Sequence, residues 1–287
     1  MNRQNMFGYD DILETTIATN VEAALVEDIG SGDLTALLLP ENEMVTARVI
    51  VRENAVLCGI PWFEGVMKAL DSRTEIEWSY REGDLMRAGS EVCRMTGSVR
   101  SLLTGERTAL NFLQMLSAVA TATREYVELV AGTSARIYDT RKTLPGLRVA
   151  QKYAVSVGGG ENQRMALYDA ILIKENHIAA AGGIRQALQA AFRHTGVPVQ
   201  IEVETIEQLN EALAAGAKSV MLDNFSLEDM REAVRITKES KTGAVLEASG
   251  GIDRDTVRAI AETGVDRISV GELTKHVKAT DFSMRIV

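Results

Sequence analysis

Five basic residues in the first two thirds of the chain have the types needed to bind a substrate with several negative charges. They are Arg107, Arg141, Lys142, Arg164 and Lys174. Arginine binds a carboxylate or phosphate through two parallel hydrogen bonds, whereas lysine supplies a point charge. Residues 136–174 hold seven Lys or Arg and three Asp or Glu, a net charge of +4 in a chain of net charge −9. Such a basic segment indicates a pocket for a small anion, although scattered surface charges are the simpler alternative.

Two acidic residues, Glu202 and Asp223, stand at the ends of neighbouring β-type runs. Carboxylates that face a cation-rich site bind Mg²⁺ or the hydroxyl groups of a ribose. Glu204 lies two positions after Glu202 and therefore on the same face of a strand. On an exposed strand this pair would be an ordinary solvated surface, but a strand covered on both sides favours a site. Which of the two glutamates is the main ligand is left open.

Two glycine-containing turns follow the last two β-type runs, at Ser249-Gly250-Gly251 and at Ser269-Val270-Gly271. Backbone N–H groups in such turns bind phosphate in many α/β barrels, although most glycines after strands only allow a tight turn. The chain has neither a GxGxxG nor a GxxxxGK[ST] motif, and GGGENQ (residues 158–163) lacks the third glycine. A doubly wound nucleotide-binding fold is therefore disfavoured.

Other reactive residues give weaker signals. Lys174 ends an apolar run and would be the nucleophile if the protein were a Schiff-base lyase. The three histidines show no metal-ligand spacing, and His177 and His276 are expected to be structural. Cys58 and Cys93 form no CxxC motif or disulfide framework, so we expect buried apolar side chains.

The elements that must position these residues form a repeating pattern in the second half of the chain. Short apolar, β-branched runs alternate with segments of helical period, and the runs span residues 136–139, 170–174, 199–204, 219–223, 244–249 and 267–271. Capping signals at Thr205 and Ser226 begin two of the helices, and Gly216 and Gly264 end two. Repeated βα units predict a parallel sheet, and a polar residue at each strand end is typical of an α/β barrel. Six runs predict an incomplete barrel, with strands buried on both faces.

The first part of the chain has a different pattern. A helical segment precedes alternating runs at residues 47–52 and 75–80, which predict a small antiparallel sheet packed on helices. The fold class is therefore α/β, with an N-terminal α/β sandwich domain (residues 1–115) and an incomplete barrel of parallel strands (residues 116–278). Residues 279–287 alternate like a strand and are expected to return to the first sheet.

Composition excludes several classes of protein. The acidic balance, with 31 Lys or Arg against 40 Asp or Glu, argues against nucleic-acid and anionic-membrane binding. The polar residues 1–11 do not resemble a signal peptide, and no apolar run is long enough to span a bilayer. We expect a cytoplasmic protein with an aliphatic core, since 46% of residues are hydrophobic and 5% aromatic.

Several runs together resemble the quinolinate phosphoribosyltransferase family over nearly the whole chain. They are LTGERTALN (103–111), DTRKTLPGLR (139–148), KYAVSVGGG (152–160), LIKENHI (172–178), MLDN (221–224), EASGGI (247–252) and SVGELTKH (269–276). The resemblance implies a type II phosphoribosyltransferase fold. It also implies transfer of phosphoribosyl from phosphoribosyl pyrophosphate to quinolinate with decarboxylation, a step of NAD biosynthesis.

The resemblance also implies roles for individual residues. Arg141, Lys142, Arg164 and Lys174 would hold the pyridine dicarboxylate, and Arg107 would enter from the partner of a homodimer that can assemble further. Lys142, Lys174, Glu202 and Asp223 would carry the reaction, the two carboxylates serving Mg²⁺ mainly through substrate and water. The remaining expected contacts to substrate are Thr140, Gln163, Ser249, Gly250, Gly251, Ser269, Val270 and Gly271.

One position departs from the family pattern. The family commonly has His-Arg after the triple glycine, whereas this chain has Gln163-Arg164. Glutamine donates hydrogen bonds but has no charge and does not titrate near neutral pH. The change is the one hint toward a related transferase with another acceptor. Two further alternatives, which do not rest on it, are the Schiff-base lyase that uses Lys174 and a noncatalytic binding barrel.

Overall fold

The computed structural model describes residues 10–41, 43–194 and 196–287 and divides into two compact units. Unit 1 contains the described residues up to Arg124, residues 143–159 and residues 276–287; unit 2 contains residues 125–142 and 160–275. The N-terminal residues 1–9, which argued against a signal peptide, lie outside the described part. None of the described helices is both long and apolar enough to cross a membrane.

The sheet of unit 1 has the strand order β12-β1-β5-β3, with all pairs antiparallel. Its strands are β1 (Met44–Val51), β3 (Glu75–Trp78), β5 (Glu91–Ser98) and β12 (Phe282–Ile286). The pair Val49–Met284 lies in the register of β1 with β12, so the chain end returns to the first sheet as its alternation predicted. A separate two-stranded sheet pairs β2 (Ala55–Val56) with β4 (Leu85–Met86).

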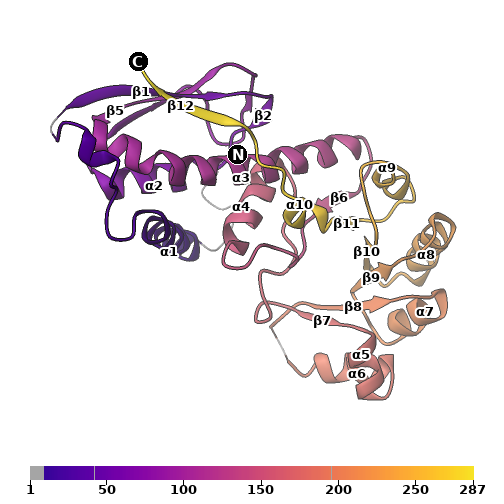
Figure 1. Ribbon diagram of the computed structural model, residues 1–287. Helices are drawn as coiled ribbons and strands as arrows, with labels where there is room; N and C mark the ends of the chain where they lie inside the picture. The colour runs from indigo at the N-terminus through magenta and orange to yellow at the C-terminus, as the bar shows by residue number, and fades with distance from the viewer. Residues whose placement is uncertain (1–9, 42, 195) are drawn as a thin grey trace. The chain divides into compact units, whose positions relative to one another are not determined.

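The helices of unit 1 cover one side of this sheet (Figure 1). They are α1 (Asp10–Ile29), α2 (Ile60–Leu70), the first part of α3 (Val99–Leu129) and α4 (Arg148–Gly158), with a short 3-10 turn η2 (Ala36–Leu38). Trp62 and Phe63 of α2 are fully buried, and a β-carbon at Gly65 would lie 3.1 Å from Val21 Cγ2 of α1. The two helices therefore pack closely.

Unit 2 contains a parallel sheet of six strands in the order β6-β11-β10-β9-β8-β7. The strands are β6 (Arg136–Tyr138), β7 (Ile171–Ile173), β8 (Val199–Val203), β9 (Ser219–Asp223), β10 (Val245–Ser249) and β11 (Arg267–Ser269). Among the described residues β6 and β7 do not pair with each other, so the barrel is incomplete. All six predicted runs are confirmed as strands.

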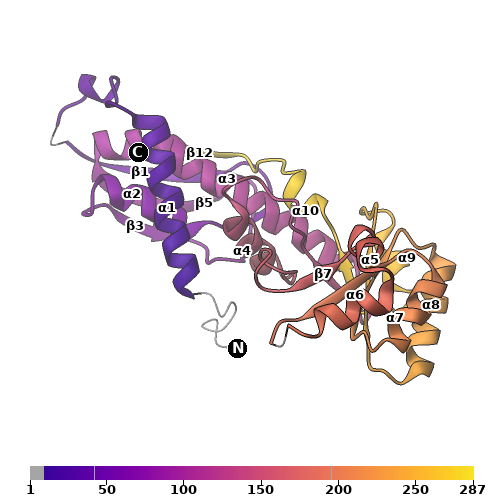
Figure 2. The ribbon, with the colours of Figure 1, turned by 90° about the horizontal axis from the view of Figure 1, so that it is seen from below.

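Helices of unit 2 line the outer face of this sheet (Figures 1 and 2). They are α5 (Glu175–Ala181), α6 (Ile184–Ala191), α7 (Ile206–Ala214), α8 (Leu227–Ser240), α9 (Val257–Ala261) and α10 (Glu272–Lys275). Helices α7 and α8 begin at the predicted caps, where Thr205 and Ser226 accept hydrogen bonds from the backbone of Gln208 and Asp229. Apolar residues such as Val220, Leu222 and Leu246 are buried on this face, each contributing about 2 kcal/mol.

The two compact units divide the chain differently from the predicted domains, because α3 continues past residue 115 to Leu129 and residues 143–159 belong with unit 1. One expectation about the fold needs correction: the strands of unit 2 are not apolar on both faces. Buried Gln200, Glu202 and Glu247 alternate with apolar residues, so the inner face is polar.

Candidate active site

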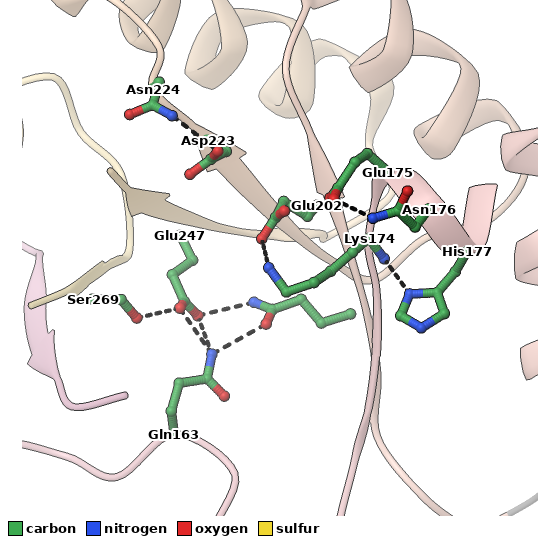
Figure 3. Close-up of polar contacts among 11 residues, drawn as sticks. Gln163, Lys174, Glu175, Asn176, His177, Glu202, Asp223, Asn224, Glu247 and Ser269 are labelled. Atoms are coloured by element: carbon green, nitrogen blue, oxygen red, sulfur yellow. Dashed lines mark hydrogen bonds and ion pairs between the residues drawn. The ribbon is translucent and has the colours of Figure 1, made fainter. Parts of the chain in front are cut away.

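The register of the parallel sheet brings the predicted polar residues to one face. Glu202 pairs with Met221, Met221 pairs with Glu247, and Asp223 pairs with Ser249 on the next strand. Residues two apart in a strand share a face, so these side chains form two adjacent rows near the carboxyl ends of the strands. Figure 3 shows them with Lys174, which follows β7. Parallel strands all end at one edge, which is where α/β barrels bind substrates.

Lys174 and Glu202 form an ion pair at this edge. Lys174 Nζ lies 2.7 Å from Glu202 Oε2, and the side chains are 43% and 9% exposed, respectively. A nearly buried carboxylate is stable only when paired or hydrogen-bonded, and Lys174 provides this partner from a more exposed position. His177 does not join them; its Nδ1 accepts a hydrogen bond from the backbone N–H of Lys174 at 3.0 Å. The expected structural role of His177 is confirmed.

A tight corner after β9 and β10 requires glycine at position 250. Asn224 has φ +56° and its N–H donates to Ser249 O at 3.0 Å, while its amide donates to Asp223 Oδ2 at 3.0 Å. A β-carbon on Gly250, whose φ is +103°, would lie 2.1 Å from Asn224 Oδ1 and 3.0 Å from Asn224 N. The corner therefore brings Asp223, Ser249 and the Gly250-Gly251 backbone together.

The turn after β6 presents Lys142 to the turn after β11. The Lys142 N–H donates to Thr140 Oγ1 at 3.1 Å, and the Thr274 hydroxyl donates to Lys142 O at 2.8 Å. A β-carbon on Gly271 would lie 3.1 Å from Lys142 Cδ and 3.8 Å from Lys142 Nζ. Glycine at position 271 thus leaves room for the lysine side chain, and Thr140, Lys142 and Gly271 are confirmed as neighbours.

Arg141 and Arg164 form a pair of like charges. Burial lowers the pKa of the Arg164 guanidinium from its usual value, the positive charge of Arg141 lowers it further, and Asp169 opposes both effects. Arginine remains protonated under any such shift. An anion bound by both guanidinium groups would offset this repulsion, which fits an acceptor with carboxylates.

Gln163 is directed elsewhere than predicted. Its Nε2 donates to Glu247 Oε2 at 2.6 Å, to Glu247 Oε1 at 2.8 Å and to Gln200 Oε1 at 3.1 Å (Figure 3). Its Oε1 accepts from the backbone N–H of Arg164 at 3.0 Å. The amide is thus bonded to buried protein groups, and this geometry does not support a contact with substrate.

Sequence reasoning missed the partners of Gln163. Glu247 is 0% exposed and also accepts from Gln200 Nε2 at 2.9 Å and from the Ser269 hydroxyl. Asp139, also fully buried, accepts from the Gln163 N–H and from the Asn162 amide. The alternation of Gln200 and Glu202 with apolar residues was the available signal, because period 2 places both on one face.

The structure also bears on the predictions for Val270, for Arg107 and for the two cysteines. The Val270 side chain is fully buried, so only its backbone could meet a substrate. Arg107 is exposed on α3 in unit 1, and its role stays a prediction. Cys58 and Cys93 are free and buried as expected, and burial raises the pKa of both thiols.

The carboxylates of the site suit a loosely held cation. Glu202 and Asp223 lie on adjacent strands, and no cluster of three or more His, Cys, Asp or Glu suited to a metal occurs among the described residues. Mg²⁺ commonly takes one or two protein carboxylates and completes its shell with substrate phosphates and water. The donor set therefore fits Mg²⁺ brought by a phosphorylated substrate and does not form a cage of its own.

The chain is similar to known proteins over most of its length. Residues 33–117 match the quinolinate phosphoribosyl transferase N-terminal domain, and residues 119–285 match the C-terminal domain. A probable nicotinate-nucleotide pyrophosphorylase [carboxylating] of Synechocystis is 41% identical over 92% of this chain and 90% of its own; a Bacillus subtilis protein of the same name is 40% identical over 91% and 90%. The solved nicotinate-nucleotide pyrophosphorylase of Francisella tularensis is 46% identical, covers 95% of this chain and 96% of its own, and superposes with a TM-score of 0.91. This chain belongs to the quinolinate phosphoribosyltransferase family.

Proposed function

We propose that this protein transfers the phosphoribosyl group of phosphoribosyl pyrophosphate to quinolinate and releases pyrophosphate and carbon dioxide, giving nicotinate mononucleotide for NAD biosynthesis. The observation that carries the proposal is the juxtaposition of opposite charges at the strand ends of unit 2. The Arg141–Arg164 pair suits a dicarboxylate, and the Lys174–Glu202 pair with Asp223 suits a ribose diphosphate.

In the proposed reaction the cationic residues orient the two substrates. Arg141, Lys142, Arg164 and Lys174 bind the carboxylates of quinolinate, so that its ring nitrogen faces the anomeric carbon. The nitrogen attacks that carbon while the bond to pyrophosphate breaks, and the electron pair leaves with pyrophosphate. Glu202 and Asp223 lie near the positive charge that develops on the ribose, and Lys142 and Lys174 stabilise the leaving group.

Decarboxylation follows from the charge of the product. Once alkylated, the ring nitrogen is positive, and the bond to the adjacent carboxylate breaks with its electron pair moving into the ring. The ring carbon then takes a proton from water. The protein has little to add to this second step beyond holding the ring in place.

The proposal assigns the 5′-phosphate and the cation to different binding sites. The 5′-phosphate lies against Ser249, Gly250, Gly251, Ser269 and Gly271. Glu202 and Asp223 would hold Mg²⁺ through substrate and water, and the ion would neutralise charge on the pyrophosphate group.

The proposal includes a homodimer in which Arg107 reaches the partner's site. Its support is that Arg107 is exposed on a long rigid helix and lies in the unit that does not hold the other site residues. A cytoplasmic location is also part of the proposal, supported by two free cysteines.

The reaction is tested with purified protein, quinolinate, phosphoribosyl pyrophosphate and Mg²⁺. We expect equal amounts of carbon dioxide and pyrophosphate, and neither product when chelator removes Mg²⁺. Turnover of nicotinate but not quinolinate would instead show a transferase with another acceptor. If borohydride traps a carbonyl substrate on Lys174 without phosphoribosyl pyrophosphate, the protein is a lyase. If quinolinate binds but is not turned over, the protein is a noncatalytic barrel.

A further inference from the structure

We propose that Gln163 and Glu247 form a positioning pair that holds Arg164 beside Arg141, so that both guanidinium groups meet the carboxylates of the acceptor. The inference deepens the proposed function and depends on it for the identity of the acceptor. It assigns an indirect role to half-buried Gln163 and fully buried Glu247, whose hydrogen bonds Figure 3 shows.

Glu247 is the anchor of this pair. It lies in the middle of β10 with no solvent exposure, and its two oxygens accept hydrogen bonds from Gln163, Gln200 and Ser269. All these donors are uncharged. Burying a carboxylate is costly, and an apolar residue of similar size would normally serve stability as well or better. A buried carboxylate that is surrounded by hydrogen-bond donors therefore indicates that these donors must be held in fixed positions.

Gln163 connects Glu247 to the backbone of Arg164. Its amide nitrogen is bonded to Glu247 and Gln200, whereas its amide oxygen accepts from the backbone N–H of Arg164. The Gln163 side chain thus connects strand β10 to Arg164, the residue that is proposed to bind the substrate. Figure 3 shows the Gln163 amide directed at Glu247.

A second buried carboxylate extends the connection to Arg141. Asp139 accepts from the Gln163 N–H at 2.8 Å and from Asn162 Nδ2 at 2.6 Å, and Asp139 stands two residues before Arg141. The segment that carries Arg141 and the segment that carries Arg164 are therefore tied to each other. The tie opposes the repulsion between the two guanidinium groups; burial is the main cause of the lowered pKa of Arg164, and the positive charge of Arg141 adds to it.

The pair explains why glutamine can stand at this position. A neutral amide presents two N–H groups and one oxygen, and these reach a carboxylate, a second amide and a backbone N–H at once. Glutamine therefore does not need to touch the acceptor in order to support its binding.

The test exchanges the two partners. Gln163→Glu sets two carboxylates against each other, Glu247→Gln removes the buried charge, and the double variant restores an amide–carboxylate pair in the opposite sense. We expect each single variant to raise KM for quinolinate at least about tenfold, with kcat and KM for phosphoribosyl pyrophosphate changed less than about threefold. The double variant should regain most of the lost affinity for quinolinate. Gln189→Glu, on the exposed face of α6, controls for the added charge.

Two results would overturn the proposal. If Gln163 touches the acceptor directly, the double variant stays as impaired as Gln163→Glu, because its carboxylate faces those of quinolinate. If the pair serves stability alone, the variants melt at lower temperature but bind quinolinate with unchanged KM. Gln163→Asn, which keeps the amide but shortens its reach, gives the same comparison should Gln163→Glu not fold.

Wild-type turnover is measured in the same series. Wild-type protein that releases no carbon dioxide from quinolinate contradicts the proposed function itself. Normal wild-type turnover with unaffected variants contradicts only the positioning pair.

Discussion

At the scale of single residues, the site places like charges together and depends on the substrate to relieve their repulsion. Burial and the positive charge of Arg141 lower the pKa of Arg164, which stays protonated, and Lys142 lies next to Gly271. A dicarboxylate that binds between such groups gains charge-assisted hydrogen bonds and removes a repulsion at the same time. Loss of one basic residue should therefore affect acceptor binding more than the fold.

Replacement of Arg141 or Lys142 by alanine tests this view. Each change should cost about 2–3 kcal/mol of transition-state stabilisation, about a 30- to 150-fold loss of kcat/KM for quinolinate. The thermal midpoint should stay close to that of the wild type. Steady-state kinetics and calorimetry measure both, with Arg231→Ala on the exposed surface of α8 as the control. Wild-type kinetics in Arg141→Ala would remove that residue from the site.

Gly250→Ala tests the corner after β10. The added β-carbon would meet the backbone and side chain of Asn224, and the residue would keep a positive φ. We expect a loss of about 1–3 kcal/mol in the free energy of unfolding and a higher KM for phosphoribosyl pyrophosphate.

Gly132→Ala is the matched control for the corner, because Gly132 also has positive φ (+81°) but nothing lies within 4 Å of an added β-carbon. Both variants share the strain of the backbone, so the difference between them reports the clash with Asn224. Equal effects of the two substitutions would contradict the role assigned to the corner.

At the scale of elements, hydrogen-bonded turns hold the helices in place. In unit 1 the Asp33 carboxylate accepts from the backbone N–H groups of Thr35 and Ala36 at 2.9 and 3.1 Å and from the Thr104 hydroxyl at 2.8 Å. The turn that contains η2 is thereby joined to α3. A carboxylate that receives several donors in the folded state is stabilised in its charged form.

This turn should make stability depend on pH. The backbone N–H of Ala36 and the Thr104 hydroxyl lower the pKa of Asp33 below its usual value of 3.8. The folded state therefore binds this proton less tightly than the unfolded state, and the stabilisation is present above pH 3.8 and lost as the pH falls through the lower folded value.

Urea unfolding of the wild type and Asp33→Ala at pH 7 and pH 3 measures this effect. The difference in free energy of unfolding between the two proteins should be larger at pH 7 than at pH 3. The exposed Asp255→Ala is the control. A difference that stays constant or grows toward acid pH would show that the carboxylate is not stabilised by this turn.

At the scale of the whole molecule, the chain separates one basic residue from the others. Arg107 lies in unit 1, whereas Arg141, Lys142, Arg164 and Lys174 lie in unit 2. The proposed dimer accounts for this division, because each active site would then take residues from two chains. A dimer with shared sites has a simple signature in mixtures of variants.

Mixing Arg107→Ala with Lys142→Ala tests the shared site. Each variant alone should be nearly inactive, but a hybrid dimer contains one site with both changes and one site with neither. A statistical mixture should therefore recover about a quarter of wild-type activity. Sedimentation must show a dimer, and absence of recovery with demonstrated subunit exchange would place Arg107 in its own chain's site.

The sequence alone determined the local structure and the types of residue in the site. The periods of the apolar residues predicted all six strands of unit 2, and the caps at Thr205 and Ser226 predicted where α7 and α8 begin. These features depend on residues a few positions apart, which is why local patterns suffice. The sequence also predicted that basic and acidic residues gather at strand ends that meet at one edge, whereas the structure showed that Lys174 pairs with Glu202 and that Arg141 acts on Arg164.

Only the tertiary structure decided which unit residues 143–159 join and where the amide of Gln163 points. Gln163 and Glu247 are 84 positions apart, and their contact depends on which strands are neighbours and on their exact register. A periodic pattern states which face of a strand is polar, but not which distant side chain lies opposite. The physical reason is that long-range contacts are selected by packing of the whole sheet, which no short segment contains.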